Sequence, residues 1–129
     1  MQRTYESLIE EAKKVSKNAY APYSKFQVGA CALFENGNIY TGCNVENGSY
    51  GLSLCAERNA LSNAIAAGET SKLVAIAIYA PSQPKCTPCG ACRQWIYEFS
   101  NQTKVIIENE KQELEIYSIE ELLPKGFLL

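Results

Sequence analysis

The first part of the chain has the apolar spacing of an amphipathic helix. Across residues 3–19, apolar side chains recur every three or four positions, and charged side chains fill most of the positions between them. This period predicts a helix with one face on a core. After a loop interrupted by Pro22, residues 26–34 alternate with a period of two, which predicts a strand.

A hairpin is expected directly after this strand. Asn36-Gly37 is the strongest short hairpin signal, so residues 39–43 should return as a second strand. A loop rich in Gly and Asn covers residues 44–53. Residues 54–68 are rich in Ala and Leu, with Ser53 as the expected N-cap of a helix and Gly68 as its stop.

The remaining segments predict three strands and two helices. The apolar run 72–80 is typical of a strand covered on both faces. Thr87-Pro88 has the residue types of an N-cap and first helical position, for a helix that ends near Phe99. Two short strands, 104–108 and 114–117, then precede a last helix. Its Ser118 and Glu121 have the spacing of a capping box.

The element order is therefore α-β-β-α-β-α-β-β-α. It predicts an α/β fold of three layers, α/β/α, with a mixed five-stranded sheet between helices. The 129 residues suit a single domain over residues 1–129, and an apolar content of 47% allows an ordinary core.

Charge and hydropathy narrow the classes of partner. The net charge is −2, and no basic run exceeds Lys13-Lys14, which argues against a nucleic-acid polymer as ligand. The longest mostly apolar run, Leu73 to Ala80, is too short to span a membrane, and the N-terminal residues lack the apolar core of a signal peptide. We therefore expect no membrane partner and a cytoplasmic location, where thiols stay reduced.

The cysteines carry the candidate chemistry, because the chain has six of them and no histidine. Cys55 and Cys89 fall in the first turns of two predicted helices, where the helix dipole favours the thiolate. Cys89 and Cys92 are three residues apart and share a helix face. Three thiolates with one open position would make a catalytic zinc site, since structural sites are closed by four ligands.

Two charged residues next to Cys55 fit such a site. Glu57 is near enough to take a proton from metal-bound water and to deliver it to a substrate, although most helix glutamates are solvated. Three thiolates leave a zinc centre negative, and Arg58 could offset this charge by hydrogen-bonding the sulfurs. The alternative for Arg58 is an exposed helix arginine.

Other uses of the cysteines stay open at this point. Cys89-Gly90-Ala91-Cys92 alone matches a redox CxxC that opens a helix. With Cys86 it copies the start of an iron–sulfur run, but position 96, where the next cysteine belongs, is Ile. Cys31 and Cys43 lie in predicted strands and are expected to be core residues, and Cys86 is expected to be a bystander.

Longer motifs make the sequence resemble a known family. Cys55-Ala56-Glu57 and Pro88-Cys89-Gly90-Ala91-Cys92 match the zinc deaminase signature. The blocks YAPYSKFQVGA, TGCNVENGSYG, CAERNAL, PCGACRQ and EELLPKGF extend the resemblance, nearly end to end, to the small cytidine deaminases of the homotetrameric type.

The resemblance implies a zinc-dependent reaction that converts cytidine or deoxycytidine and water into uridine or deoxyuridine and ammonia, in pyrimidine salvage. It implies Zn²⁺ held by Cys55, Cys89 and Cys92, with Glu57 as proton shuttle. A deaminase of another small aminopyrimidine nucleoside, such as a nucleoside antibiotic, is the alternative. The preference between cytidine and deoxycytidine is left open.

The resemblance also implies contacts to the nucleoside. Phe26 would line the base pocket, the Ala56 N–H would hold the base carbonyl, and Asn44 with Glu46 would bind the ribose 3′-hydroxyl. In a homotetramer with shared active sites, Tyr50 and Phe127 would approach a neighbour's site.

Overall fold

The computed structural model describes residues 3–129, and its elements follow the predicted order. They are α1 (Tyr5–Ser16), β1 (Gly29–Phe34), β2 (Ile39–Cys43), the 3-10 helix η1 (Tyr50–Leu52), α2 (Ala56–Ala66), β3 (Leu73–Tyr79), α3 (Gly90–Phe99), β4 (Lys104–Glu108), β5 (Leu114–Ser118) and α4 (Ile119–Leu122). The one addition is η1, which lies within the loop expected over residues 44–53.

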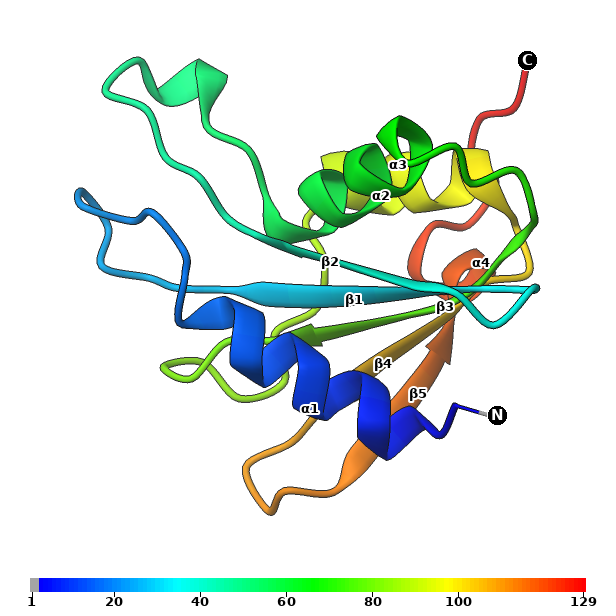
Figure 1. Ribbon diagram of the computed structural model, residues 1–129, viewed down its shortest axis with the longest axis horizontal. Helices are drawn as coiled ribbons and strands as arrows, with labels where there is room; N and C mark the ends of the chain where they lie inside the picture. The colour runs from blue at the N-terminus through cyan, green and yellow to red at the C-terminus, as the bar shows by residue number, and fades with distance from the viewer. Residues whose placement is uncertain (1–2) are drawn as a thin grey trace.

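The strands form a mixed five-stranded sheet in the order β2-β1-β3-β4-β5. Neighbouring strands are antiparallel except for β3 and β4, which are parallel and are joined through α3. In Figure 1, α1 covers one face of the sheet, while α2 and α3 lie on the other. The three-layer α/β/α prediction is confirmed.

The alternation in β1 divides its side chains between two cores. Val28, just before the strand, and Ala30, Ala32 and Phe34 within it face the core beneath α2 and α3. Cys31 faces the core under α1 and is fully buried, as expected. Cys43 is only half-buried, because it ends the edge strand β2.

The predicted turn glycines and the capping box of the last helix are confirmed. Gly37 in the hairpin and Gly68 after α2 have φ angles of 91° and 88°, the left-handed region that glycine enters without steric cost. Ser118 and Glu121 form the predicted capping box.

The predicted starts of α2 and α3 are wrong by two residues. Cys55 is the N-cap of α2 in place of Ser53, whose hydroxyl accepts instead from the Asn47 N–H at 3.1 Å. Leu54 then pairs with Val45, which keeps the chain extended up to the helix. At α3 the N-cap is Cys89 in place of Thr87.

Close packing on β2 holds α2 in position. A Cβ at Gly42 would lie 2.3 Å from the Ala60 nitrogen, so only glycine permits this approach of helix and strand. The Asn59 and Asn63 side chains donate to the carbonyls of Cys43 and Thr41, both at 2.8 Å. These contacts fix the N-terminus of α2, where Cys55 and Glu57 lie.

Within residues 3–129, no helix is long and apolar enough to cross a membrane.

Candidate functional site

Three cysteine sulfurs meet where α2 and α3 begin. Cys55 and Cys89 are the N-caps of these helices, and Cys92 lies in the first turn of α3. Their Sγ atoms all lie within 4.8 Å of one another, and those of Cys55 and Cys89 are 3.9 Å apart. The described residues hold no other group of three potential metal ligands this close.

This donor set fits a zinc ion. Zinc–sulfur bonds of about 2.3 Å in a tetrahedron separate the sulfurs by about 3.8 Å, close to the Cys55–Cys89 distance. Without a cation, three thiols this close resist joint ionisation. Hydrogen bonds from Cys92 and Arg58 lower the pKa of Cys55, whereas the contact with Cys55 raises that of Cys92. A divalent cation would remove this conflict by compensating the crowded negative charge.

Arg58 lies against the cluster. Its Nη2 donates to the Cys55 Sγ at 3.4 Å, across one turn of α2. Its Nε is buried and has no hydrogen-bond partner within residues 3–129. The guanidinium therefore brings positive charge next to a thiolate, where it offsets part of the negative charge of three sulfurs.

Glu57 is the buried acid of the site. Its side chain projects from the first turn of α2, and the residue is only 4% exposed. Burial and, to a smaller extent, the charge of Cys55 raise the pKa of Glu57 to about 7. A carboxyl group with this pKa can both accept and release a proton near neutral pH.

A cavity of about 250 Å³ joins these groups to other parts of the chain. Its walls include Phe26, Asn44, Glu46, Cys55, Ala56, Glu57 and Cys89, all singled out from the sequence, and also Val28, Ser53, Leu54 and Cys86, which were not assigned to the site. Burial raises the pKa of Cys86 to about 11, so its thiol stays neutral. The cavity walls thus combine thiol groups, two carboxyl groups and one amide.

Asn44 and Glu46 are polar residues of the cavity wall, and backbone groups hold both of them. Asn44 accepts from the Val28 N–H at 2.8 Å and donates to the Phe26 carbonyl at 2.7 Å, and its second amide hydrogen has no acceptor among residues 3–129. The Oε1 atom of Glu46 accepts from the N–H groups of Tyr23 and Ser24, at 3.0 and 3.2 Å, and its Oε2 accepts from the Ser24 hydroxyl.

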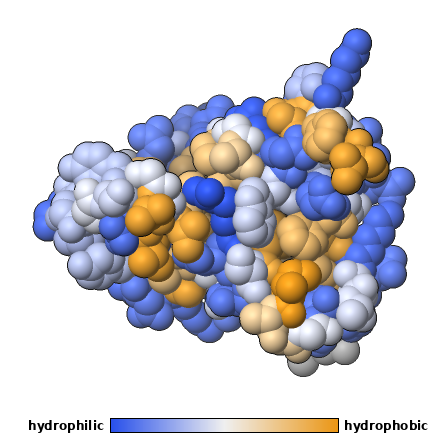
Figure 2. All heavy atoms as spheres, turned by 90° about the horizontal axis from the view of Figure 1, so that it is seen from above, coloured by the Kyte–Doolittle hydropathy of each residue, from blue (hydrophilic) through white to orange (hydrophobic). Residues whose placement is uncertain are grey.

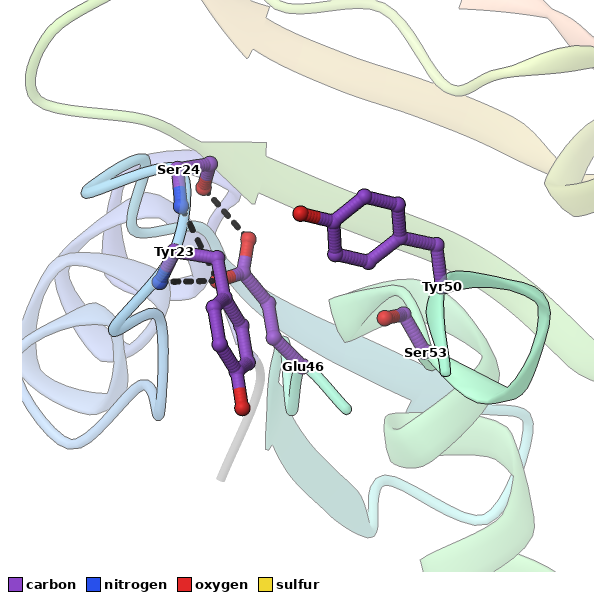
Figure 3. A pocket seen from close by; sticks show the side chains of 5 residues that line it. All are labelled: Tyr23, Ser24, Glu46, Tyr50 and Ser53. Atoms are coloured by element: carbon purple, nitrogen blue, oxygen red, sulfur yellow. Dashed lines mark hydrogen bonds between the residues drawn. The ribbon is translucent and has the colours of Figure 1, made fainter. Parts of the chain in front are cut away.

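A second hollow of about 360 Å³ adjoins the first through Glu46 and Ser53, which line both. Figure 3 shows Tyr50 across this hollow from Ser24, with its hydroxyl directed toward the Glu46 side. Tyr50 is 76% exposed and packs edge-on against Tyr23, with ring centroids 6.1 Å apart.

Phe127 is absent from the walls of both hollows. Gln94 on α3 holds its backbone with two hydrogen bonds, one donated to the Phe127 carbonyl at 2.7 Å and one accepted from its N–H at 3.1 Å. The residue is 64% exposed. Within one chain, Phe127 and Tyr50 are therefore available for contact with another molecule.

The sequence analysis missed Tyr23 and Ser24 as partners of Glu46. They lie 23 and 22 residues before it, and the Tyr23 contact is made through the backbone. The sequence signal was the Tyr23-Ser24 pair within the block YAPYSKFQVGA, which was used for the resemblance alone.

Comparison with known proteins agrees with this geometry. The family model of the cytidine and deoxycytidylate deaminase zinc-binding region matches residues 2–108. The cytidine deaminase of Sporosarcina psychrophila is 46% identical over 123 residues, which are 95% of this chain and 90% of that protein. The crystal structure of the Burkholderia pseudomallei cytidine deaminase has a TM-score of 0.90 at 43% identity, over 97% of this chain and 100% of that one.

A second structure agrees with the first. The cytidine deaminase of Mycobacterium tuberculosis has a TM-score of 0.86 at 35% identity, over 99% of this chain and 100% of that one. These findings leave the redox and iron–sulfur interpretations of the CxxC without support. The chain belongs to the cytidine and deoxycytidylate deaminase family, with Zn²⁺ as its cofactor.

Proposed function

We propose that the chain hydrolyses the exocyclic amino group of cytidine and deoxycytidine, with uridine or deoxyuridine and ammonia as products. The observation that carries this proposal is the set of groups that share a cavity with Glu57. A buried carboxyl group of raised pKa lines the same cavity as two cysteines of the cluster, Cys55 and Cys89, and the walls of that cavity also carry an amide and a carboxylate. Family membership supports the same chemistry.

Cys55, Cys89 and Cys92 would hold the zinc ion. When bound, Zn²⁺ supplies Lewis acidity that makes a water molecule nucleophilic at neutral pH. Arg58 offsets part of the thiolate charge through its bond to the Cys55 Sγ.

Glu57 is the proton shuttle of this proposal. Its carboxylate takes a proton from the water whose oxygen bonds C4 and passes it to ring N3. It then takes the remaining proton from the new hydroxyl group and passes it to the amino group, which leaves as the C4–N bond breaks. One water is consumed and one ammonia released, so atoms and protons balance. A pKa of about 7 suits both the acceptance and the donation of a proton.

The base is held by apolar and backbone groups. Phe26 offers a flat apolar wall on the cavity. Ala56 is the first residue of α2, and helix geometry leaves its N–H without an intrahelical acceptor, so it is available to the base carbonyl. These contacts orient C4 toward Glu57 and the cysteine sulfurs.

The sugar would lie against Asn44 and Glu46. Asn44 keeps one free N–H, and Glu46 keeps one free acceptor position on Oε2, because a carboxylate oxygen can accept about two hydrogen bonds. A donor and an acceptor side by side suit a hydroxyl group that both accepts and donates, and the resemblance to cytidine deaminases assigns this role to the ribose 3′-hydroxyl.

We further propose a homotetramer in which neighbours complete each other's sites. Figure 2 shows apolar side chains gathered in several clusters on the face that carries α2 and α3. Large apolar side chains are exposed in η1, α2, α3 and the C-terminal segment, at Tyr50, Leu52, Ile65, Trp95, Phe127, Leu128 and Leu129. Burying them between copies would remove apolar surface from water. A single domain, a cytoplasmic location and a role in pyrimidine salvage belong to the same proposal.

The test pairs metal analysis with an ultraviolet assay on the purified protein. We expect about one zinc ion per chain and a decline of the cytidine absorbance band as uridine forms. Zinc without any change in cytidine or deoxycytidine would contradict the proposed substrate and redirect the search to other aminopyrimidine nucleosides. Protein that folds but binds no zinc would contradict the assigned metal site.

A further inference from the structure

The Glu46 carboxylate depends on one short loop for its orientation. The N–H groups of Tyr23 and Ser24 both donate to Oε1, and the Ser24 hydroxyl donates to Oε2. Ser24 is therefore the residue that controls Oε2, the oxygen that keeps a free acceptor position. In Figure 3 the dashed lines from Ser24 and Tyr23 converge on this carboxylate at the edge of the hollow.

A second hydrogen bond sets the direction of the Ser24 hydroxyl. Its oxygen accepts from the Phe26 N–H at 3.0 Å, so its own proton points away from that N–H and is free for Glu46. Lys25, between the two residues, has a φ of 61°, in the left-handed region, and its N–H bonds to the Ala21 carbonyl at 3.0 Å. This turn brings the Phe26 N–H back to the Ser24 side chain.

The charge on Glu46 agrees with this arrangement. The hydrogen bond from the Ser24 hydroxyl is the largest cause that lowers the pKa of Glu46, and the two backbone N–H groups add to it. The carboxylate is thus kept ionised and can act only as an acceptor toward a ligand.

We infer that Ser24 is a positioning residue for sugar recognition, which fixes Glu46 Oε2 so that its free lone pair receives one hydroxyl of the nucleoside. This inference rests on the proposed nucleoside substrate. Ser24 links both ends of the ligand site, because the oxygen that orients Glu46 also bonds the backbone of the base-wall residue Phe26. Ser24 is not placed at the reacting atoms, so its effect should be on binding.

The experiment compares two substrates and two variants. kcat and KM are measured for the wild type, Ser24→Ala and Ser24→Thr, with cytidine and with 3′-deoxycytidine. For Ser24→Ala we expect KM for cytidine to rise roughly three- to tenfold, which is less than the full value of a hydrogen bond to a charged group because two N–H groups still hold the carboxylate. Its kcat should stay near that of the wild type.

The second substrate and the second variant make the test specific. With 3′-deoxycytidine, Ser24→Ala should match the wild type, because the hydroxyl that Glu46 binds is missing. Ser24→Thr keeps the hydroxyl and should restore cytidine binding, since Ser24 is exposed and has room for a methyl group. Ser62→Ala, at an exposed position on α2, is the control for general effects of losing a serine hydroxyl.

Three results would overturn the inference. They are an equal loss with both nucleosides, an unchanged KM for cytidine in Ser24→Ala, and a loss in Ser24→Thr as large as that in Ser24→Ala. Failure of the proposed function gives a different result, since the wild type would then not deaminate cytidine at all. Melting temperatures of all variants separate a loss of binding from a loss of folded protein.

Discussion

Neighbouring residues at the start of α2 have opposite environments. Ala56 and Glu57 are buried, whereas Cys55 and Arg58 are half-buried around the sulfur cluster. A buried carboxyl group costs free energy unless it is protonated or paired, and burial accordingly raises the pKa of Glu57 to about 7. Such a residue is costly as a structural element, which supports its use in proton transfer.

Replacement of this carboxyl group should separate metal binding from turnover. In Glu57→Gln we expect an unchanged zinc content, because the three thiols remain, and a fall in kcat beyond the about 10²–10⁴-fold of a single acid–base step. Zinc analysis and the ultraviolet assay give both readouts. Glu113→Gln, at an exposed turn position, is the matched control. Turnover close to that of the wild type would remove Glu57 from the proposed mechanism.

Substitution of Cys86 tests which cysteines bind zinc. It lines the same cavity as Cys55 and Cys89 but lies outside the cluster of three sulfurs. We expect Cys86→Ser to keep the zinc content of the wild type and Cys89→Ser to lose it, as measured by metal analysis after gel filtration. Loss of zinc from Cys86→Ser would mean that the wrong sulfurs were assigned.

Two helix ends and one hairpin position the site at the scale of elements. The starts of α2 and α3 hold the cysteines, and Gly42, Asn59 and Asn63 dock α2 on β2. At the far end of α2, Glu69 ties the helix to the β1–β2 hairpin. Its carboxylate accepts from the Tyr40 hydroxyl at 2.9 Å and from the Ser71 hydroxyl at 2.7 Å, and also from the side-chain amides of Asn36 and Asn38.

Glu69 should make stability depend on pH. Hydrogen bonds from Ser71, and then from Tyr40 and Asn38, lower its pKa from 4.5 to about 2. The ionised carboxylate therefore stabilises the folded state, and this stabilisation is complete at pH values above the ordinary pKa of 4.5. It is lost as the pH falls from about 4.5 to about 2. We expect Glu69→Gln to have a lower melting temperature than the wild type at pH 7, because an amide nitrogen would face hydrogen-bond donors.

The quantity to measure is the difference in melting temperature between the wild type and Glu69→Gln as a function of pH. It should shrink as the pH falls through that window, when the wild-type carboxylate also becomes protonated. Glu113→Gln serves again as the control and should follow the wild type throughout. A difference that is independent of pH would contradict the role of the Glu69 charge.

For the molecule as a whole, the distribution of exposed apolar side chains favours contact between copies of the chain. Large apolar side chains are exposed in η1, α2, α3 and the C-terminal segment, and Gln94 anchors the Phe127 backbone on α3. A phenylalanine held by its backbone with its side chain in water loses conformational freedom without burying apolar surface. Contact with another copy would supply that burial.

The C-terminal segment should therefore contribute to assembly. We expect wild-type protein to sediment with the mass of four chains, and Phe127→Ala to dissociate at higher concentrations or to show a raised KM for cytidine. Ile116→Ala, which removes an exposed apolar side chain from β5, is the control. An unchanged mass and an unchanged KM in Phe127→Ala would show that Phe127 contributes only to packing within its own chain.

Local spacing accounts for how much could be predicted from sequence. The period of 3.6 in residues 3–19, the alternation in residues 26–34 and the Asn36-Gly37 turn each act within a few residues. Local patterns of this kind predicted the element order, and that order predicted a mixed five-stranded sheet but not the order of its strands. The helix starts were missed because Ser53 and Thr87 have good capping chemistry. At Ser53, contacts to Asn47 and, through Leu54, to Val45 keep the chain extended as far as Cys55.

The site divides in the same way. Cys55, Glu57, Cys89 and Cys92 could be named from the sequence, because their spacing on two helix starts brings thiols and an adjacent acid together, and the family resemblance favoured a zinc site over redox chemistry. The link from Ser24 to Glu46 joins residues 22 positions apart, and the link from Glu69 to Asn36 joins residues 33 apart. The sequence by itself determined the order of the elements and the candidate reactive groups, since both arise from short-range spacing. Only the tertiary structure decided which distant side chains meet, because chain closure over long separations depends on the packing of the whole sheet.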